Sequence, residues 1–179
     1  MDLNKKHIDV KGFTLIELLL VIVVIGVLAT VGLSILNPQE MNRKARDSRR
    51  LSDLGMLRRS LDMSMSDGNK LPNTNKNPVV IDSSMSPSTF GGGLGIDISK
   101  YIPSIPQDPS YSSGGDLQIA KGDCITGTAT STMQYEFSSN GTTYILRSRL
   151  ESVSNCRLLS DDGNNDDYYE LGTQPGLKW

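Results

Sequence analysis

An uninterrupted apolar stretch near the N-terminus, residues 13–36, limits the folds open to this chain more than any other feature. As an α-helix it would be about 36 Å long, enough to cross the roughly 30 Å hydrocarbon core of a bilayer. Its only charged residue is Glu17, and an ionised carboxylate in hydrocarbon costs roughly 2–4 kcal/mol. A cleaved secretory signal would have a shorter apolar core followed by a small-residue cleavage site. A plain single-pass anchor fits the length but leaves Glu17 unexplained.

The composition of the remaining chain excludes several functional classes. A net charge of −2 over 179 residues gives no overall basic excess that would indicate nucleic acid. The single histidine, His7, lies in a basic tail before the apolar stretch, so a catalytic or zinc site built on histidine is nearly excluded. Without His7 no set of nucleophile, base and orienting residue can be assembled, and a membrane-anchored enzyme is disfavoured.

The sequence KGFTLIELLLVIVVIGVLA, residues 11–29, resembles the class III leader and N-terminal helix of type IV prepilins and type II secretion pseudopilins. In that family a membrane peptidase cuts after the glycine that ends a short basic leader. The resemblance implies a leader over residues 1–12, cleavage between Gly12 and Phe13, and N-methylation of Phe13. It also implies that Glu17 serves assembly, by pairing with the Phe13 amine of a neighbouring subunit as the helices form a filament.

The same resemblance implies an architecture and a set of partners. The fold would be α+β and pilin-like, with a long N-terminal helix packed on a small antiparallel β-sheet. Residues 13–37 would form a transmembrane and assembly helix, residues 38–67 its soluble amphipathic half, and residues 68–179 a loop-rich β domain. The implied partners are other copies of the chain in a helical homopolymer, the prepilin peptidase, the assembly platform, minor pilins and the membrane. The N-terminus would be cytoplasmic, in the bacterial inner membrane, and the C-terminal domain would lie outside, later in a periplasmic or extracellular filament.

Five basic residues follow the apolar stretch: Arg43, Lys44, Arg46, Arg49 and Arg50. A positive-inside count would place the downstream domain in the cytoplasm, but long domains translocate largely regardless of charge, and the leader implies the opposite. The cluster predicts a solvated helix face that contacts lipid headgroups. The alternative is the DNA-binding surface of a competence pilin, which we disfavour because no aromatic residues interleave with the charges. A surface pilus, a secretion pseudopilus and a competence pilus all stay open, as does a major or a minor subunit.

Two regular patterns lie further along the chain. Apolar residues at three- and four-residue steps predict an amphipathic helix that breaks from the first at Pro38 and ends at Asp67-Gly68; they are Leu51, Leu54, Leu57, Leu61 and Met65. Alternating residues from Met133 to Leu146 predict a hairpin with Asn140-Gly141 in a type I′ turn, packed on that apolar stripe. Between them, residues 72–109 read as a low-helicity connector whose segment YIPSIPQDP resembles one found in major pseudopilins.

Cys124 and Cys156 flank the predicted hairpin. In an exported protein, a disulfide between them is the simple interpretation, and the alternative is two unrelated buried thiols. The chain-entropy model gives about 3–4 kcal/mol for closing this loop. Redox catalysis is not expected, because there is no C-x-x-C pair.

An acidic segment, SDDGNNDDYYELG at residues 160–172, holds the candidate metal ligands. It is not an EF-hand, because Asp167 stands where that loop needs a glycine. Major pseudopilins that resemble this chain bind calcium in a C-terminal loop, so we consider a calcium site, with a solvated acidic turn as the alternative. No other cofactor is expected. The candidate ligands are Asp161, Asp162, Asn164, Asp166 and Asp167.

Overall fold

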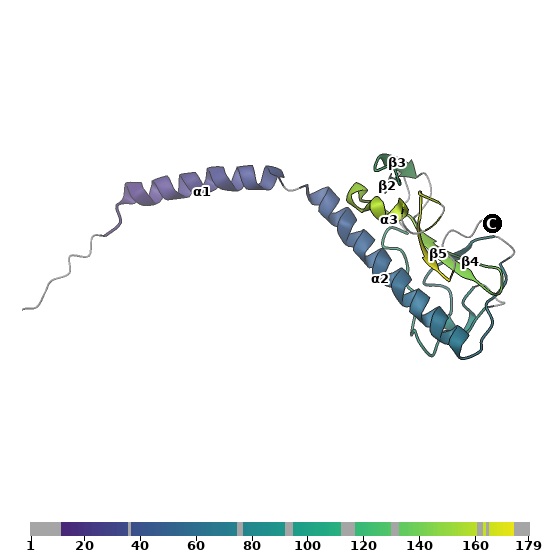
Figure 1. The fold of residues 1–179 in the computed structure, drawn as a ribbon. Helices are drawn as coiled ribbons and strands as arrows, with labels where there is room; N and C mark the ends of the chain where they lie inside the picture. Colours follow the sequence, from purple (N-terminus) through teal and green to yellow (C-terminus); the bar gives the residue numbers. More distant parts are fainter. Residues whose placement is uncertain are drawn as a thin grey trace, which may run out of the picture. The chain divides into compact units, whose positions relative to one another are not determined.

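A computed structural model gives the fold (Figure 1), and it divides the chain into two compact units, Met1–Pro38 and Gln39–Trp179. It describes residues 12–35, 37–74, 77–91, 95–111, 117–129, 133–160, 163 and 165–173, without the side chains of residues 31–35. Most of the predicted leader, residues 1–11, therefore lies outside the described residues, as do Asp161, Asp162 and Asn164 of the predicted calcium site.

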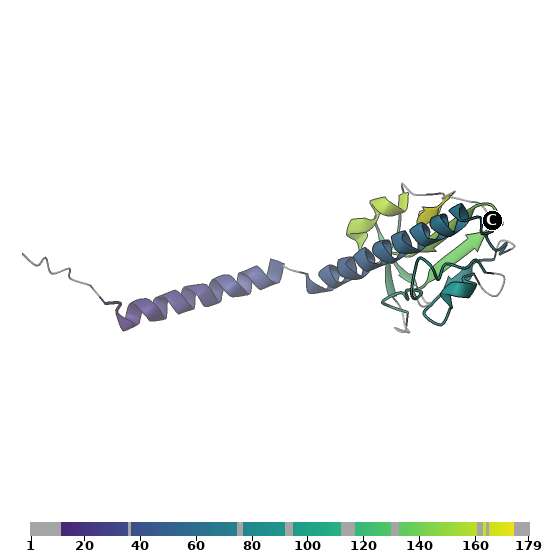
Figure 2. The same ribbon diagram turned by 90° about the horizontal axis from the view of Figure 1, so that it is seen from below.

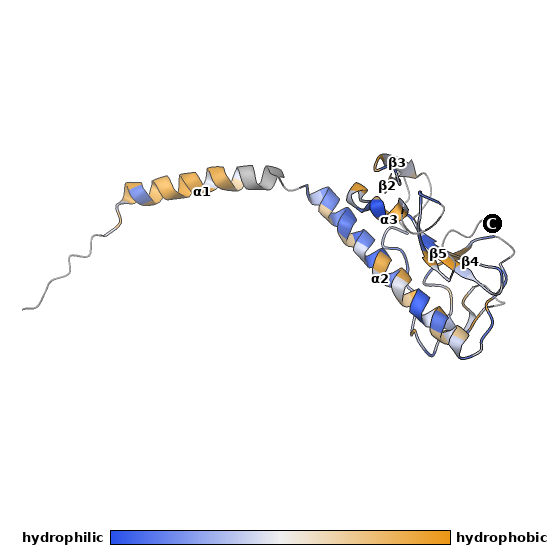
Figure 3. Cartoon of the chain, in the orientation of Figure 1, coloured by the Kyte–Doolittle hydropathy of each residue, from blue (hydrophilic) through white to orange (hydrophobic). Residues whose placement is uncertain are grey.

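The first unit contains one helix, α1, which spans Leu15–Ile35. Thr14 caps its start, because the backbone N–H of Glu17 donates to Thr14 Oγ1 at 3.3 Å. Thr14-Leu-Ile-Glu17 thus has the spacing of a capping box. The helix dipole also favours an acidic residue in the first turn. Figure 3 shows α1 coloured hydrophobic over most of its described length. Within the described residues, none of the helices combines the length and the apolar character that a bilayer crossing requires.

The second helix, α2, spans Pro38–Ser66. A proline suits the first helical position, where its missing N–H would have had no partner, so the predicted break between the helices falls at Pro38. At the other end the N–H of Gly68 donates to the carbonyl of Met65 at 3.0 Å, and Gly68 has a φ of 91°. Glycine adopts this left-handed conformation without strain, which confirms the predicted end of the helix.

A four-stranded antiparallel sheet, ordered β1-β4-β5-β6, forms the centre of the second unit. Its strands are β1 (Val79–Ile81), β4 (Tyr135–Ser139), β5 (Tyr144–Ser148) and β6 (Tyr169–Gly172). A separate pair joins β2 (Leu117–Ala120) to β3 (Thr126–Ala129), and the short helices are η1 (Pro87–Thr89), η2 (Val153–Asn155) and α3 (Arg157–Ser160). The edge strand β1 lies inside the predicted connector, where three β-branched residues gave too short a pattern to predict a strand.

The predicted hairpin is present as β4 and β5, but the type I′ turn is wrong. Ser139 pairs with Tyr144, and the N–H of Asn140 donates to the carbonyl of Thr143 at 3.2 Å, so Gly141-Thr142 is the centre of the turn. A type I′ turn needs positive φ at both central residues, and Gly141 alone has it in this turn. The side-chain oxygen of Asn140 instead accepts from the N–H groups of Thr142 and Thr143, which moves the turn one residue along.

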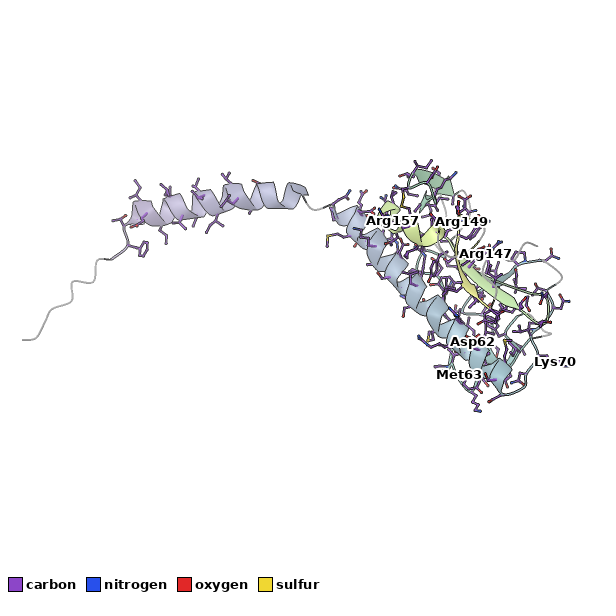
Figure 4. All side chains as sticks on the ribbon, in the orientation of Figure 1. Asp62, Met63, Lys70, Arg147, Arg149 and Arg157 are labelled. Atoms are coloured by element: carbon purple, nitrogen blue, oxygen red, sulfur yellow. A yellow bond between two sulfur atoms is a disulfide. The ribbon has the colours of Figure 1, made fainter. Side chains whose placement is uncertain are left out.

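The main core lies between α2 and the sheet, and Figure 2 shows α2 crossing the β domain along its length. Leu54, Leu57 and Leu61 are fully buried against aromatic and aliphatic side chains of β4 and β5. Two sheet tyrosines also bond to α2: the Tyr135 hydroxyl donates to Asp53 at 2.9 Å, and that of Tyr144 to Asp62, labelled in Figure 4, at 2.6 Å. The predicted α+β fold, with a helix packed on a small antiparallel sheet, is confirmed.

Candidate functional site

The predicted cleavage and assembly residues lie together at the start of the first unit. Gly12, Phe13 and Thr14 are non-helical and exposed, and a Cβ atom added to Gly12 would meet no other atom within 4 Å. Phe13 has 80% of its surface exposed. Glu17 is exposed in the first turn of α1, and within the described residues its carboxylate has no cationic partner. The peptide bond after Gly12 is therefore accessible, and Glu17 is available to pair with another molecule.

Apart from Glu17 and Thr30, the described surface of α1 is apolar on every side. Its large apolar side chains from Leu15 to Leu28 are between 43% and 83% exposed. A helix that is hydrophobic all round is stable only when lipid or other protein surrounds it. Among the described residues, the side chains of α1 belong to none of the core clusters.

The first half of α2 carries a buried ionic cluster, which we call the Arg50 cluster: Asp47, Arg50, Asp108, Ser110 and Glu151. Arg50 is fully buried and donates to Asp108 through Nε at 2.8 Å and Nη2 at 2.9 Å. Its Nη1 donates to Asp47 at 2.8 Å, and its Nη2 also reaches Glu151 at 2.6 Å. The predicted solvated basic face is therefore wrong at Arg50, because Asp47 of the same helix and two carboxylates from distant segments surround the guanidinium.

The charges in this cluster stabilise one another against burial. Burial alone would raise the pKa of the Glu151 carboxyl, but hydrogen bonds from Arg46 and Arg50 and the charge of Arg50 lower that pKa to about 2. Burial likewise opposes the charged form of Arg50, yet its bonds to Asp108 and the charge of Glu151 raise the Arg50 pKa above its usual value. Glu151 and Arg50 are therefore both ionised at neutral pH, and it is costly to leave a buried charge of this cluster unpaired.

The other basic residues of the predicted lipid- or DNA-contacting run are also largely neutralised. Arg43 lies 3.5 Å from Glu40, Arg49 lies 3.7 Å from Asp53, and Arg46 Nε donates to Glu151 at 2.9 Å. Lys44 alone of the five has no carboxylate partner within the described residues. This pairing leaves little unpaired positive charge in this run of basic residues.

One sequence signal could have indicated the burial of Arg50. Arg50 precedes Leu54, Leu57 and Leu61 by four, seven and eleven residues, so it shares their helix face. Asp47, three residues earlier, is a helix neighbour of opposite charge. What the helix pattern could not indicate is the identity of Asp108 and Glu151, which are 58 and 101 residues away in the chain.

The structure joins Cys124 and Cys156 in a disulfide, with their Cα atoms 5.1 Å apart. Cys124 lies in the turn between β2 and β3, and Cys156 lies between η2 and α3. The bond therefore links the small two-stranded sheet to the segment that carries Glu151. Within the described residues, Cys124 is the one non-glycine residue with a positive φ, 62°, and it lies in the turn at this link.

Two of the predicted calcium ligands line a shallow depression of about 250 Å³. Asp166 and Asp167 lie there with Lys121, Gly122 and Asp123, from the turn after β2. A Cβ atom at Gly122 would come within 2.4 Å of the Cβ of Asp166, so only glycine allows this approach. Within the described residues, however, no group of three or more His, Cys, Asp or Glu side chains is placed to hold a metal ion.

The comparisons with known proteins match the N-terminal motif and, for one group of relatives, up to 61% of the chain. The family described as "Prokaryotic N-terminal methylation motif" matches residues 9–33. Type II secretion system core protein G of Klebsiella pneumoniae is 35% identical over 111 residues, which cover 61% of this chain and 73% of that protein. The chain belongs to the prepilin and pseudopilin family.

Other members of the prepilin and pseudopilin family show the same range of similarity. Type II secretion system core protein G of Escherichia coli (strain K12) is 36% identical over 101 residues, covering 55% of this chain and 66% of that protein. Type IV major fimbrial protein FimA of Dichelobacter nodosus is 42% identical over 62 residues, covering 34% of this chain and 36% of that protein. No solved structure matches the chain.

Membership in the prepilin and pseudopilin family confirms the predicted function at the level of the family. The chain is a structural subunit of a pilus-like or pseudopilus filament, processed at its N-terminal motif and assembled through its N-terminal helix. The motif match over residues 9–33 includes the glycine, the phenylalanine and the glutamate that the sequence singled out.

Proposed function

We propose that the chain is the core pseudopilin of a type II secretion-like system. The observation that carries the proposal is the similarity to core protein G over 111 residues, which continues well beyond the methylation motif. In this proposal the precursor is held in the inner membrane with its N-terminus in the cytoplasm. A prepilin peptidase cuts between Gly12 and Phe13 and methylates Phe13, and an assembly platform with minor pseudopilins adds the subunit to a periplasmic filament.

The exposed apolar surface of α1 supports this sequence of events. Lipid would cover the helix before assembly, and the helices of neighbouring copies would cover it afterwards. Cleavage after Gly12 creates an α-amine on Phe13, one helical turn from Glu17. Two charges that are each expensive in an apolar bundle then offset one another when the amine of one copy meets the carboxylate of the next. We infer a structural rather than an enzymatic role, because the relatives are named as core and fimbrial proteins.

We expect Gly12→Ala to block removal of the leader. The added methyl group obstructs close approach of the backbone in the peptidase cleft, although it meets nothing within 4 Å in the chain itself. Mass spectrometry of the subunit, from cells that contain the peptidase, should show a chain that still begins at Met1. Gly26→Ala is the matched control, since its Cβ also meets nothing within 4 Å and it should be processed normally. Normal processing of Gly12→Ala would refute the assignment of the cleavage site.

We also propose that the acidic segment binds calcium. Carboxylate oxygens are the ligands that calcium prefers, and Asp123, Asp166 and Asp167 line the depression beside Gly122. The described carboxylates alone are not placed to hold a metal ion. Lys121 lines the same depression and opposes a cation there. The site would therefore need the further oxygen ligands predicted from the sequence, Asp161, Asp162 and Asn164. When bound, calcium would supply a multivalent positive charge that holds these oxygens together.

If calcium binds, the full-length chain in detergent should melt at a higher temperature in its presence. At a free concentration one hundred times the dissociation constant, the gain in unfolding free energy is about 2.7 kcal/mol. The double variant Asp166→Ala/Asp167→Ala should lose the gain, and magnesium should not replace calcium, because it demands a tighter octahedral shell. Calcium-independent melting of the wild type, or an equal calcium gain in the double variant, would eliminate the site.

A further inference from the structure

The base of α2, residues 40–50, is attached to the rest of its unit by polar contacts. None of these residues contributes an apolar side chain to the core clusters of the described residues, which on α2 begin at Leu54. Asp47, which is fully buried, accepts from the backbone N–H groups of Glu151 and Ser152, each at 2.9 Å, and from Asn155 Nδ2 at 3.0 Å. Such contacts hold a helix only if their partners are already ordered.

The partners of Asp47 outside α2 all belong to one short segment, residues 150–160, which we call the clasp. Arg50, at the end of the base, is also bonded to Asp108 and Ser110, which lie outside the clasp. On the side of α2 the clasp presents the side chains and backbone groups just described, and it also donates from Ser152 Oγ to Glu40. The clasp is also bonded to the end of β2, where the N–H of Ala120 donates to the carbonyl of Leu150 at 2.8 Å. The disulfide from Cys156 to Cys124 adds a covalent attachment, one residue beyond Asn155.

We propose that the clasp is a redox-dependent fastening for the base of α2. The two thiols stay reduced in the cytoplasm, and the bond forms after export. Its formation passes two electrons and two protons from Cys124 and Cys156 to an exported protein disulfide, which becomes a dithiol. The bond orders residues 151–155 in advance, so that Asp47 and Glu40 find their donors in place. Oxidation thereby fixes the stretch of α2 that follows α1 in the sequence. This control is independent of the kind of filament that the subunit enters.

Hydrogen–deuterium exchange of the full-length chain in detergent tests this coupling. Peptides that cover residues 44–50 report on the base of α2, and peptides that cover residues 57–61 report on its part in the apolar core. Exchange is compared in the oxidised wild type, in the wild type treated with dithiothreitol, and in the Cys124→Ser/Cys156→Ser double variant with and without the reductant. Asp47→Asn, with its disulfide intact, is the fifth sample, and it weakens the contact between α2 and the clasp on the α2 side.

Opening the disulfide should speed exchange at residues 44–50 by about tenfold or more while changing it at residues 57–61 by less than about twofold. The double variant should match the reduced wild type and ignore the reductant, and Asp47→Asn should show the same local acceleration. Unchanged exchange at residues 44–50 would overturn the proposal. An equal rise at both places would overturn it as well, because the bond would then stabilise the whole unit rather than the base of α2. The reduced wild type gives the answer even if the double variant is not produced.

Discussion

Replacing Arg50 with alanine should lower the unfolding free energy of the second unit by about 3–5 kcal/mol, the usual cost of breaking a buried ion pair from one side. Arg50 is fully buried, and its guanidinium is the group that Asp47, Asp108 and Glu151 share. Without it, three carboxylates face one another in a site closed to water. The loss therefore includes their desolvation and their mutual repulsion, in addition to the lost hydrogen bonds.

The matched control is Arg49→Ala, one position along the same helix. Arg49 has 64% of its side chain exposed and lies 3.7 Å from Asp53, so its removal should cost less than about 0.5 kcal/mol. Arg50→Lys keeps the charge but loses the planar guanidinium that bonds to several carboxylates at once. Its loss of unfolding free energy should lie between those of Arg50→Ala and Arg49→Ala. Urea unfolding of the full-length chain in detergent, followed by near-UV circular dichroism, gives the three values.

The urea unfolding experiments are carried out at neutral pH. The Glu151 pKa is lowered to about 2 from an ordinary value of 4.5, so the contribution of Glu151 is fully present above pH 4.5 and is lost as the pH falls toward 2. If Arg50→Ala is no less stable at pH 7 than Arg49→Ala, the Arg50 cluster does not hold the unit together, and the buried geometry described here is incorrect.

The second large effect concerns assembly. Glu17→Leu should abolish filaments or leave them irregular, while the processed subunit accumulates in the membrane fraction. The leucine makes α1 more apolar, so insertion should be at least as efficient. Cleavage should continue, because the bond after Gly12 lies a helical turn away. What disappears is the partner for the Phe13 amine of a neighbouring copy, and an unpaired cation in an apolar helix bundle is costly.

Glu17→Gln separates charge from hydrogen bonding in this pairing. The amide can still accept a hydrogen bond from the Phe13 amine, but it offers no negative charge, so filament numbers should be intermediate between those of wild type and Glu17→Leu. Filaments are counted by electron microscopy, and a blot of the membrane fraction gives the amount and size of the subunit. Wild-type filament numbers in Glu17→Leu would show that Glu17 serves some purpose other than pairing between subunits.

The sequence predicted those features that depend on local chemistry. The start of α1 follows from the apolar stretch, the end of α2 from Asp67-Gly68, and the β4–β5 hairpin from alternation around Gly141. In each case the signal lies within a few residues of the structure that it determines. The leader motif predicted the family in the same local way, because Gly12 lies just before the apolar helix and Glu17 lies in its first turn.

Features that depend on distant partners could not be predicted in the same way. The helix period places Arg50 on the buried face, but only the fold brings Asp108 and Glu151 to it. A run of basic residues therefore suggested a solvated surface where the chain has a buried cluster. The prediction of a type I′ turn at Asn140-Gly141 was wrong for a local reason. The side-chain oxygen of Asn140 accepts from the N–H groups of Thr142 and Thr143, and the turn is displaced by one residue.

The central claim is that this chain is processed at its N-terminus and polymerises through the helix that follows. The most direct measurement is the mass of the N-terminal peptide of the subunit, taken from filaments sheared from cells that produce the chain and the peptidase. The account predicts that this peptide begins at an N-methylated Phe13. A filament subunit that begins at Met1 or within α1, or filaments from which the chain is absent, would contradict it.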